Sequence, residues 1–217
     1  MIEIIRKNRF FIVPYLIFLI VSSFFLVIYS KGQLHICMNQ FHHPVVDTFF
    51  MYVTHFGDGI IVAVLIVLLL FVSYRYALIM LSSVFFTTIV IQVLKRVVFA
   101  ALPRPVVYFL GIHDLYFVPD VKMLLIYSFP SGHSASAFGV FFMLALITKN
   151  SSLKFLYFVL AFLISYSRVY LSQHFLVDIY FGSLISVFFC AVMFYLGMKL
   201  KNPKFDNSLS DVILRGI

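Results

Sequence analysis

The chain has 217 residues, of which 63% are apolar and only 11% are charged, whereas an ordinary soluble domain carries roughly a quarter charged residues. One soluble core cannot bury so much apolar surface, so the composition argues against a soluble domain and predicts a membrane protein. The net charge of +8 does not indicate a nucleic-acid partner here, because the basic residues gather at the ends of apolar runs, as they do in proteins that contact the lipid bilayer.

Six apolar segments have the length of membrane-spanning helices, which need about 20 mainly apolar residues. They cover residues 10–29, 53–73, 76–95, 131–148, 153–168 and 175–198. The first segment is not followed by a small-residue cleavage site, so we interpret it as an uncleaved span and not as a signal peptide. No linker or repeat divides the chain. The sequence therefore predicts a single all-α domain over residues 1–217, a polytopic membrane protein built as a bundle of six transmembrane helices.

The distribution of Lys and Arg predicts how this bundle is oriented. Six spans place both termini on one side, and that side holds ten of the sixteen basic residues. Because basic residues favour the cytoplasm, we expect both termini to be cytoplasmic. All seven histidines fall on the opposite, outer side: His35, His42, His43, His55, His113, His133 and His174. The functional residues discussed next fall on that side too, so we expect a site that faces the periplasm or the cell exterior.

Lys95 and Arg104 are the first two of these residues along the chain. Lys95 ends the third segment, and a lysine that extends from a membrane boundary into water is the ordinary interpretation of such a residue. Arg104 lies between Pro103 and Pro105, which restrict the backbone on both sides and fix the direction of the arginine.

Pro130-Ser131-Gly132-His133 stands where the fourth segment begins. Ser131 can cap the helix, and Gly132 allows a ligand to approach the backbone closely. Free N–H groups and the positive end of the helix dipole form an anion site, beside which His133 can act as a proton donor. An ordinary capped helix start is the alternative interpretation.

Ser167-Arg168 is followed by His174 and Asp178. Because residues four apart lie on one face of a helix, the Asp178 carboxylate can hold one ring nitrogen of His174 and leave the other free to attack. A structural His–Asp pair would look the same. Arg168 favours the functional interpretation, because a short loop can bring its guanidinium to the imidazole, where it would bind a phosphate with two hydrogen bonds.

Taken together, these residues resemble the type 2 phosphatidic acid phosphatase (PAP2) superfamily, which also contains the vanadium haloperoxidases. The signature of that family has a lysine and Arg-Pro, then Pro-Ser-Gly-His, then Ser-Arg, five residues, His, three residues and Asp. The second and third elements match in full. The first has eight residues between Lys95 and Arg104, where the family usually has six, so either Lys95 or Arg96 can fill the lysine position. The resemblance covers about residues 53–198, and His55-Phe-Gly-Asp58-Gly also looks like a segment of bacterial relatives.

The resemblance implies hydrolysis of a phosphate or diphosphate on a lipid head group through a phosphohistidine. His174 would attack phosphorus, Asp178 would orient it, and His133 would protonate the leaving oxygen. The phosphoryl oxygens would be bound by Lys95, Arg104, Ser131, Gly132 and Arg168. Fixed cations would replace a metal, so no metal ligands and no cofactor are expected.

Undecaprenyl diphosphate, phosphatidylglycerol phosphate, phosphatidic acid and lipid A phosphates all fit such a site as substrates. A lipid phosphotransferase with the same residues is an open alternative. A haloperoxidase is disfavoured by the membrane spans. A membrane transporter or scaffold is disfavoured because the spans carry little charge below their outer ends.

Overall fold

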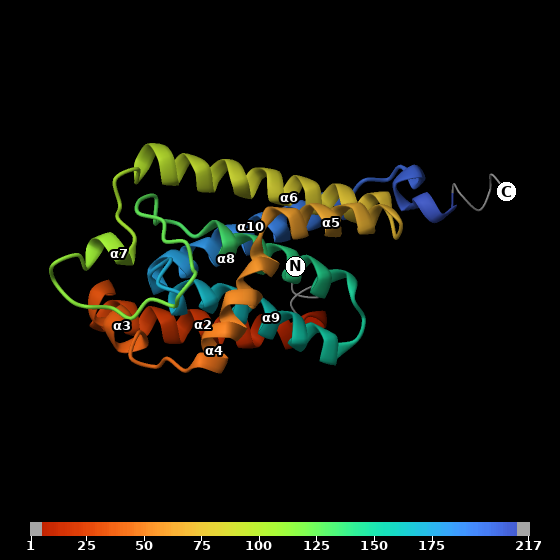
Figure 1. The fold of residues 1–217 in the computed structure, drawn as a ribbon. Coiled ribbons are helices and arrows are strands. Elements are labelled where there is room, and N and C mark those ends of the chain that lie inside the picture. Colours follow the sequence, from red (N-terminus) through yellow and green to blue (C-terminus); the bar gives the residue numbers. More distant parts are fainter. Residues whose placement is uncertain (1–5, 212–217) are drawn as a thin grey trace.

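The computed structural model describes residues 6–211, and every regular element among them is helical. The expected all-α fold is thus confirmed for this part of the chain. The five longest helices lie alongside one another in a bundle (Figure 1): α2 (Arg9–Ile28), α6 (Tyr74–Val93), α8 (Gly132–Ile147), α9 (Ser151–Tyr170) and α10 (Leu176–Met198). Helix α8 is central, because it packs extensively against both α9 and α10.

Four helices are long and apolar enough to cross a membrane: Arg9–Ile28, Tyr74–Val98, Ser151–Tyr170 and Leu176–Met198. A fifth candidate span is the pair Pro44–Gly57 and Gly59–Leu70, which is bent by 52°. Helix α8 is apolar too, but it is shorter, with 16 residues. The chain is therefore a multi-pass helical membrane protein with four or five candidate spans among the described residues. Six crossings and cytoplasmic termini stay predictions.

The segment predicted as a span over residues 53–73 is not one continuous helix. Helix α4 (Pro44–Val53) passes into a 3₁₀ turn, η1 (Thr54–Gly57), and helix α5 (Gly59–Leu70) starts after a break at Asp58. The break has a local cause. Asp58 has an extended backbone (φ −73°, ψ 147°), and its carboxylate is bonded to two histidines. A Cβ at the preceding Gly57 would lie only 3.0 Å from Ile164 Cγ2, so a larger residue in this turn would require Ile164 to shift.

The bundle has two distinct ends (Figure 1). At one end lie the short helices α3 (Lys31–Met38) and α7 (Pro105–Tyr108), neither of which the sequence predicted, together with the starts of α8 and α10. Helix α6 reaches this end in a widened π-helical turn, η2 (Leu94–Val98). The first residues of α2 and the last of α10 lie at the other end, so all the motif residues are gathered away from both described ends of the chain.

A close contact between α8 and α10 fixes the geometry of the first end. A Cβ at Gly182 of α10 would lie 2.5 Å from the carbonyl oxygen of Ser131, so only glycine fits there without a shift. The Ser131 N–H also donates to the backbone carbonyl of Asp178, at 3.0 Å. The starts of the two helices are therefore held together. His133 lies in the first turn of α8, and His174 lies just before α10 begins.

Candidate active site

His174 lies in the turn between α9 and α10, where it is almost fully buried. Its Nδ1 donates to Asp178 Oδ2 at 3.2 Å, as the four-residue spacing predicted. Within the described chain, no hydrogen bond involves the other ring nitrogen, Nε2. The pair thus holds the imidazole in one orientation and leaves Nε2 available as a nucleophile.

Asp178 is itself fixed by groups other than His174. The Ser128 hydroxyl and the Phe175 backbone N–H both donate to Asp178 Oδ2, the oxygen that binds the histidine. Sequence reasoning missed Ser128, because it belongs to an irregular loop fifty residues away from Asp178. Three donors on one oxygen keep the carboxylate from rotating, and this in turn keeps His174 in place.

Arg168 lies in the last turn of α9 and is buried beside the turn that carries His174. Its Nη1 donates to the Thr54 hydroxyl at 2.7 Å. Its Nε is buried and has no hydrogen-bond partner in residues 6–211. A buried guanidinium N–H without a partner is costly, and a bound phosphoryl oxygen would satisfy it.

Arg104 lies at the start of α7 and is also buried. It donates from Nε to the Ile126 carbonyl at 3.0 Å and from Nη1 to the Gln173 carbonyl at 2.9 Å. These bonds join the loop before α8 to the residue next to His174. Arg104 therefore brings positive charge to the site and also holds together the two segments that form it.

The structure distinguishes Lys95 from Arg96 in the π-helical turn. Lys95 is half-buried, and the charges of Arg104, Asp178 and Arg168 act on it. Arg96 is exposed, and its Nε donates to the Gln92 side chain at 2.9 Å. Lys95 thus belongs with the two arginines.

His133 lies in the first turn of α8, after Ser131 has capped the helix by accepting from the Ser134 N–H. Its Nε2 is 2.8 Å from Asp58 Oδ1, and the other Asp58 oxygen binds His55 at 3.0 Å. The sequence drew attention to the segment that contains Asp58 but gave the residue no role. A Cβ at Gly132 would touch no atom within 4 Å, so a ligand has room to approach the backbone there.

The electrostatics of the site favour a neutral imidazole at His174. Burial, followed by the charges of Arg104, Lys95 and Arg168, holds the pKa of His174 well below its ordinary value of 6.5. Burial also lowers the pKa of the Arg104 guanidinium, although the Asp178 carboxylate opposes the shift. His174 is therefore an unprotonated imidazole surrounded by cations, and this arrangement suits an attack on an anionic phosphate.

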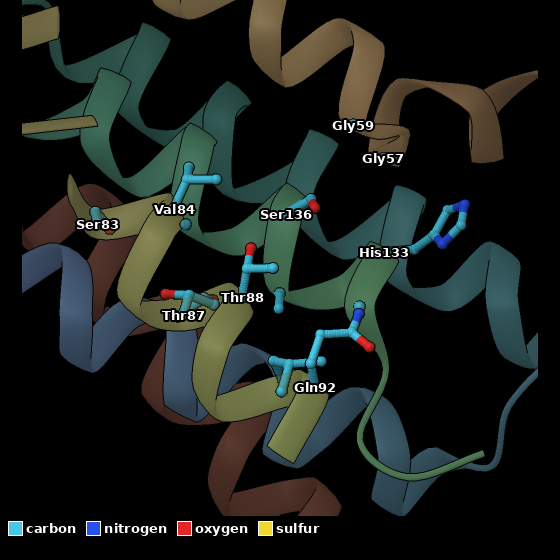
Figure 2. Close-up of a pocket in the computed structure, with 14 residues that line it drawn as sticks. Gly57, Gly59, Ser83, Val84, Thr87, Thr88, Gln92, His133 and Ser136 are labelled. Atoms are coloured by element: carbon cyan, nitrogen blue, oxygen red, sulfur yellow. The ribbon is translucent and has the colours of Figure 1, made fainter. Parts of the chain in front are cut away.

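Besides a cavity lined by Lys31, Ser128 and Asp178, two cavities adjoin the motif residues. One, of about 330 Å³, is lined by Thr54, His55, Lys122 and Arg168 among others. The second, of about 230 Å³, lies between α5, α6, α8 and α10 and is lined by Gly132 and His133 (Figure 2). Among the predicted site residues, Gly132, His133, Arg168 and Asp178 thus border a cavity.

The arrangement of these site residues agrees with a comparison of the chain with known protein families. A family model described as the PAP2 superfamily matches residues 76–201. The chain belongs to the PAP2 superfamily. The matched region contains Lys95, Arg104, the Pro130–His133 segment and the Arg168–Asp178 segment, as the resemblance in the sequence indicated.

Two solved structures resemble most of this chain. LpxE from Aquifex aeolicus is 27% identical with a TM-score of 0.67, and the match covers 75% of this chain and 93% of that one. A transmembrane PAP2-type phosphatidylglycerolphosphate phosphatase from Bacillus subtilis is 24% identical with a TM-score of 0.64, and the match covers 88% of this chain and 97% of that one. No curated protein matches significantly. The likeness in fold thus extends to both PAP2 structures over most of their length.

Proposed function

We propose that this PAP2 protein is a lipid phosphatase that hydrolyses a phosphate or diphosphate on a lipid head group through a phosphohistidine. The observation that carries the proposal is the state of His174. Its Nδ1 is fixed by Asp178, its Nε2 has no hydrogen-bond partner within residues 6–211, and the charges of Lys95, Arg104 and Arg168 act on its ring. Such a group is suited to attack phosphorus while the cations stabilise the phosphoryl oxygens.

The reaction has two steps. In the first, His174 Nε2 forms a bond to phosphorus as the bond to the leaving oxygen breaks, and protonated His133 gives its proton to that oxygen. In the second, His133 accepts a proton from water, the water oxygen attacks phosphorus, and the bond to His174 breaks. Ser131 and the backbone at Gly132 would join the three cations in binding the phosphoryl oxygens, because they stand at the N-terminus of α8.

The substrate is a phosphate-bearing membrane lipid. The chemistry of the site fits phosphatidylglycerol phosphate, phosphatidic acid, undecaprenyl diphosphate and lipid A phosphates. The charge distribution of the chain supports a site on the outer face of the cytoplasmic membrane, with both termini in the cytoplasm.

The test is phosphate release by the purified protein in detergent micelles that contain EDTA, with these lipids offered separately and His174→Ala measured in parallel. The wild type should release phosphate, and the variant should release none while remaining folded. Rapid quenching with labelled substrate should trap an acid-labile, base-stable phosphoprotein. Transfer of phosphate to an added alcohol, detected by mass spectrometry, would identify a phosphotransferase. An absolute requirement for a divalent metal, or full activity of His174→Ala, would contradict the proposal.

A further inference from the structure

Helix α3 lies before the region that the family model matches, yet it packs against α9 and α10. These two helices are joined by residues 171–175, here called the His174 turn, at the same end of the bundle as α3 (Figure 1). Three polar residues stand at intervals of four: Lys31 and His35 in α3, and Asn39 directly after it. Residues at this spacing share one face of a helix, and the contacts of all three place that face against the His174 turn.

Ser172 sets the path of the His174 turn. It is fully buried and has a left-handed backbone, with a φ of 52°. This conformation is unfavourable for any residue with a Cβ, so it persists only where the surroundings hold it. The chain turns here, and the His174 N–H then donates to the Arg168 carbonyl at 3.0 Å. The position of His174 therefore depends on whether Ser172 keeps its left-handed backbone.

Two side chains from the α3 face hold the Ser172 hydroxyl. Asn39 Nδ2 donates to Ser172 Oγ at 3.2 Å, and His35 Nε2 lies 3.1 Å from the same oxygen. Burial lowers the pKa of His35 to about 4, so the ring is neutral and its Nε2 can accept the hydroxyl proton. The hydroxyl thus accepts from Asn39 and donates to His35. Both bonds help to offset the cost of the left-handed backbone.

The imidazole of His35 is not explained by packing. Its ring centre lies 5.8 Å from that of Phe109 and 5.3 Å from that of Phe175. Its Nδ1, however, is buried and has no hydrogen-bond partner within residues 6–211. A phenylalanine could make the ring contacts without leaving a buried polar atom unsatisfied, which is costly. The bond from Nε2 to Ser172 is what a phenylalanine could not provide.

The same face of α3 also contacts Phe175, the residue that follows His174. Lys31 Nζ lies 4.8 Å from the centre of the Phe175 ring, a cation–π contact. The backbone N–H of Phe175 in turn donates to Asp178 Oδ2, the oxygen that holds the nucleophile. Helix α3 therefore contacts the His174 turn on both sides of the imidazole, at Ser172 and at Phe175.

We infer that Asn39 and His35 are positioning residues for the phosphatase reaction: by holding Ser172, they fix the His174 imidazole relative to the phosphorus that it attacks. The inference rests on the proposed function and extends its apparatus to residues outside the family signature. The three cations of the site lie on η2, at the start of α7 and at the end of α9. Loss of either positioning residue should therefore slow the attack by Nε2 and leave phosphate binding nearly unchanged.

The test measures the single-turnover rate of phosphohistidine formation from an aryl phosphate, by rapid quenching, and the inhibition constant of inorganic phosphate. Asn39→Ala should lower the rate by about 10- to 100-fold, because a nucleophile displaced by about 1 Å loses that much, and should leave the inhibition constant within about twofold. Gln40→Ala is the matched control. It removes an exposed amide from the next position, where no side-chain hydrogen bond is formed within residues 6–211, and its rate should stay within about twofold.

A second comparison isolates Ser172, because Asn39 also bonds to the backbone of Tyr116. In a Ser172→Gly background, Asn39→Ala should lower the rate by less than about threefold, since glycine adopts a φ of 52° without support. His35→Phe keeps the ring contacts but loses one hydrogen bond, so the rate should fall by about three- to tenfold. Its melting temperature should not fall, because the buried nitrogen without a partner is gone.

Three results would overturn the inference while the phosphatase function stands. They are an unchanged rate in Asn39→Ala, an effect of that substitution as large in the Ser172→Gly background as in the wild type, and a rate and melting temperature that fall together in His35→Phe. The last comparison also decides the matter if Asn39→Ala does not fold. A wild type that releases phosphate from neither lipid nor aryl phosphates would instead remove the function, and this inference with it.

Discussion

Asp58 Oδ1 lies 2.8 Å from His133 Nε2, across the break that separates η1 from α5. The contact joins a helix interruption to one of the two signature histidines. Like His174, which contacts Asp178 through Nδ1, His133 therefore has a carboxylate partner, although Asp58 also binds His55. A general acid has to carry a proton. Burial and the charge of Arg168 lower the pKa of His133 to about 4, and the Asp58 carboxylate opposes this shift because it stabilises the protonated imidazole. The break thus places a charge where the chemistry of His133 needs it.

The first prediction concerns this pair. Asp58→Asn keeps a hydrogen-bonding side chain beside His133 but removes the charge, so less His133 is protonated. We expect kcat/KM to fall by about 10- to 100-fold on phosphatidic acid, whose alkoxide needs a proton, and to change little on an aryl phosphate, whose leaving group does not. His55→Gln, at the other oxygen of Asp58, is the matched control and should have a smaller effect. Equal losses on both substrates would mean that Asp58 only supports the fold.

The second prediction separates Lys95 from Arg96. Lys95→Met should lower kcat/KM by about 100-fold or more, because it removes a cation that stabilises the transferring phosphoryl group. Arg96→Met should stay within about threefold of the wild type, because Arg96 is exposed and bonds to Gln92. Both substitutions remove one positive charge from the same turn. A difference in kcat/KM between the two variants therefore cannot come from the change in net charge alone. The opposite ranking would transfer the phosphate-binding role to Arg96.

The third prediction uses two glycines with different surroundings. Gly132→Ala adds a methyl group to open space, so thermal stability should not fall, whereas phosphate binding should weaken and KM should rise. Gly182→Ala forces its Cβ against the Ser131 carbonyl, so it should lower stability and activity together. Melting temperatures and kinetics of the two variants provide the check. A Gly132→Ala enzyme with unchanged KM would show that no ligand approaches that backbone.

The sequence was sufficient to predict which residues meet, but not what holds them. Lys95, Arg104, His133, Arg168 and His174 come together as expected, because a dense signature on helix ends specifies their placement. Their partners are different. Thr54, Ser128 and Gln173 are ordinary residues in turns, and only the folded chain brings them to Arg168, Asp178 and Arg104.

The helix break at Asp58 was missed for a related reason. Residues 53–73 are mostly apolar. Because hydropathy is averaged over a window of residues, the average does not reveal the interruption that Gly57 and Gly59 make in the helix. The π-helical turn at Lys95 was also hidden, because π-turns have no sequence signal of their own. In both places the irregular backbone lies next to the site. Near functional sites, the backbone often departs from the conformation that the local sequence favours.

The fourth prediction tests orientation. In a Cys37→Ser, Cys190→Ser background, a His113→Cys variant should react with an impermeant thiol reagent in intact cells, after permeabilisation of an outer membrane where one exists. A Lys149→Cys variant should react only after lysis. Both positions are exposed, so the comparison depends on the side of the membrane and not on burial. The reverse pattern would place the site in the cytoplasm and change the pool of lipids available to it.

The last prediction follows from the pKa of His174. The imidazole must be neutral to attack, and its pKa is held well below 6.5 by burial and by three cations. As the pH falls, kcat/KM should therefore persist until that lowered pKa is reached, because kcat/KM reports the free enzyme. Arg104→Gln removes one of the cations and raises the pKa of His174, so the acidic limb should move to higher pH.

Arg104→Lys is the matched control for this shift. The lysine keeps the positive charge but lacks the guanidinium whose Nε and Nη1 donate to the Ile126 and Gln173 carbonyls. KM should therefore rise, while the acidic limb of the pH profile should stay near its wild-type position. An aryl phosphate is the right substrate, since its leaving group does not depend on His133 and its own ionisation is the same for every variant. An acidic limb that stays in place in Arg104→Gln would mean that the limb does not report His174, and that the arginine acts on the fold alone.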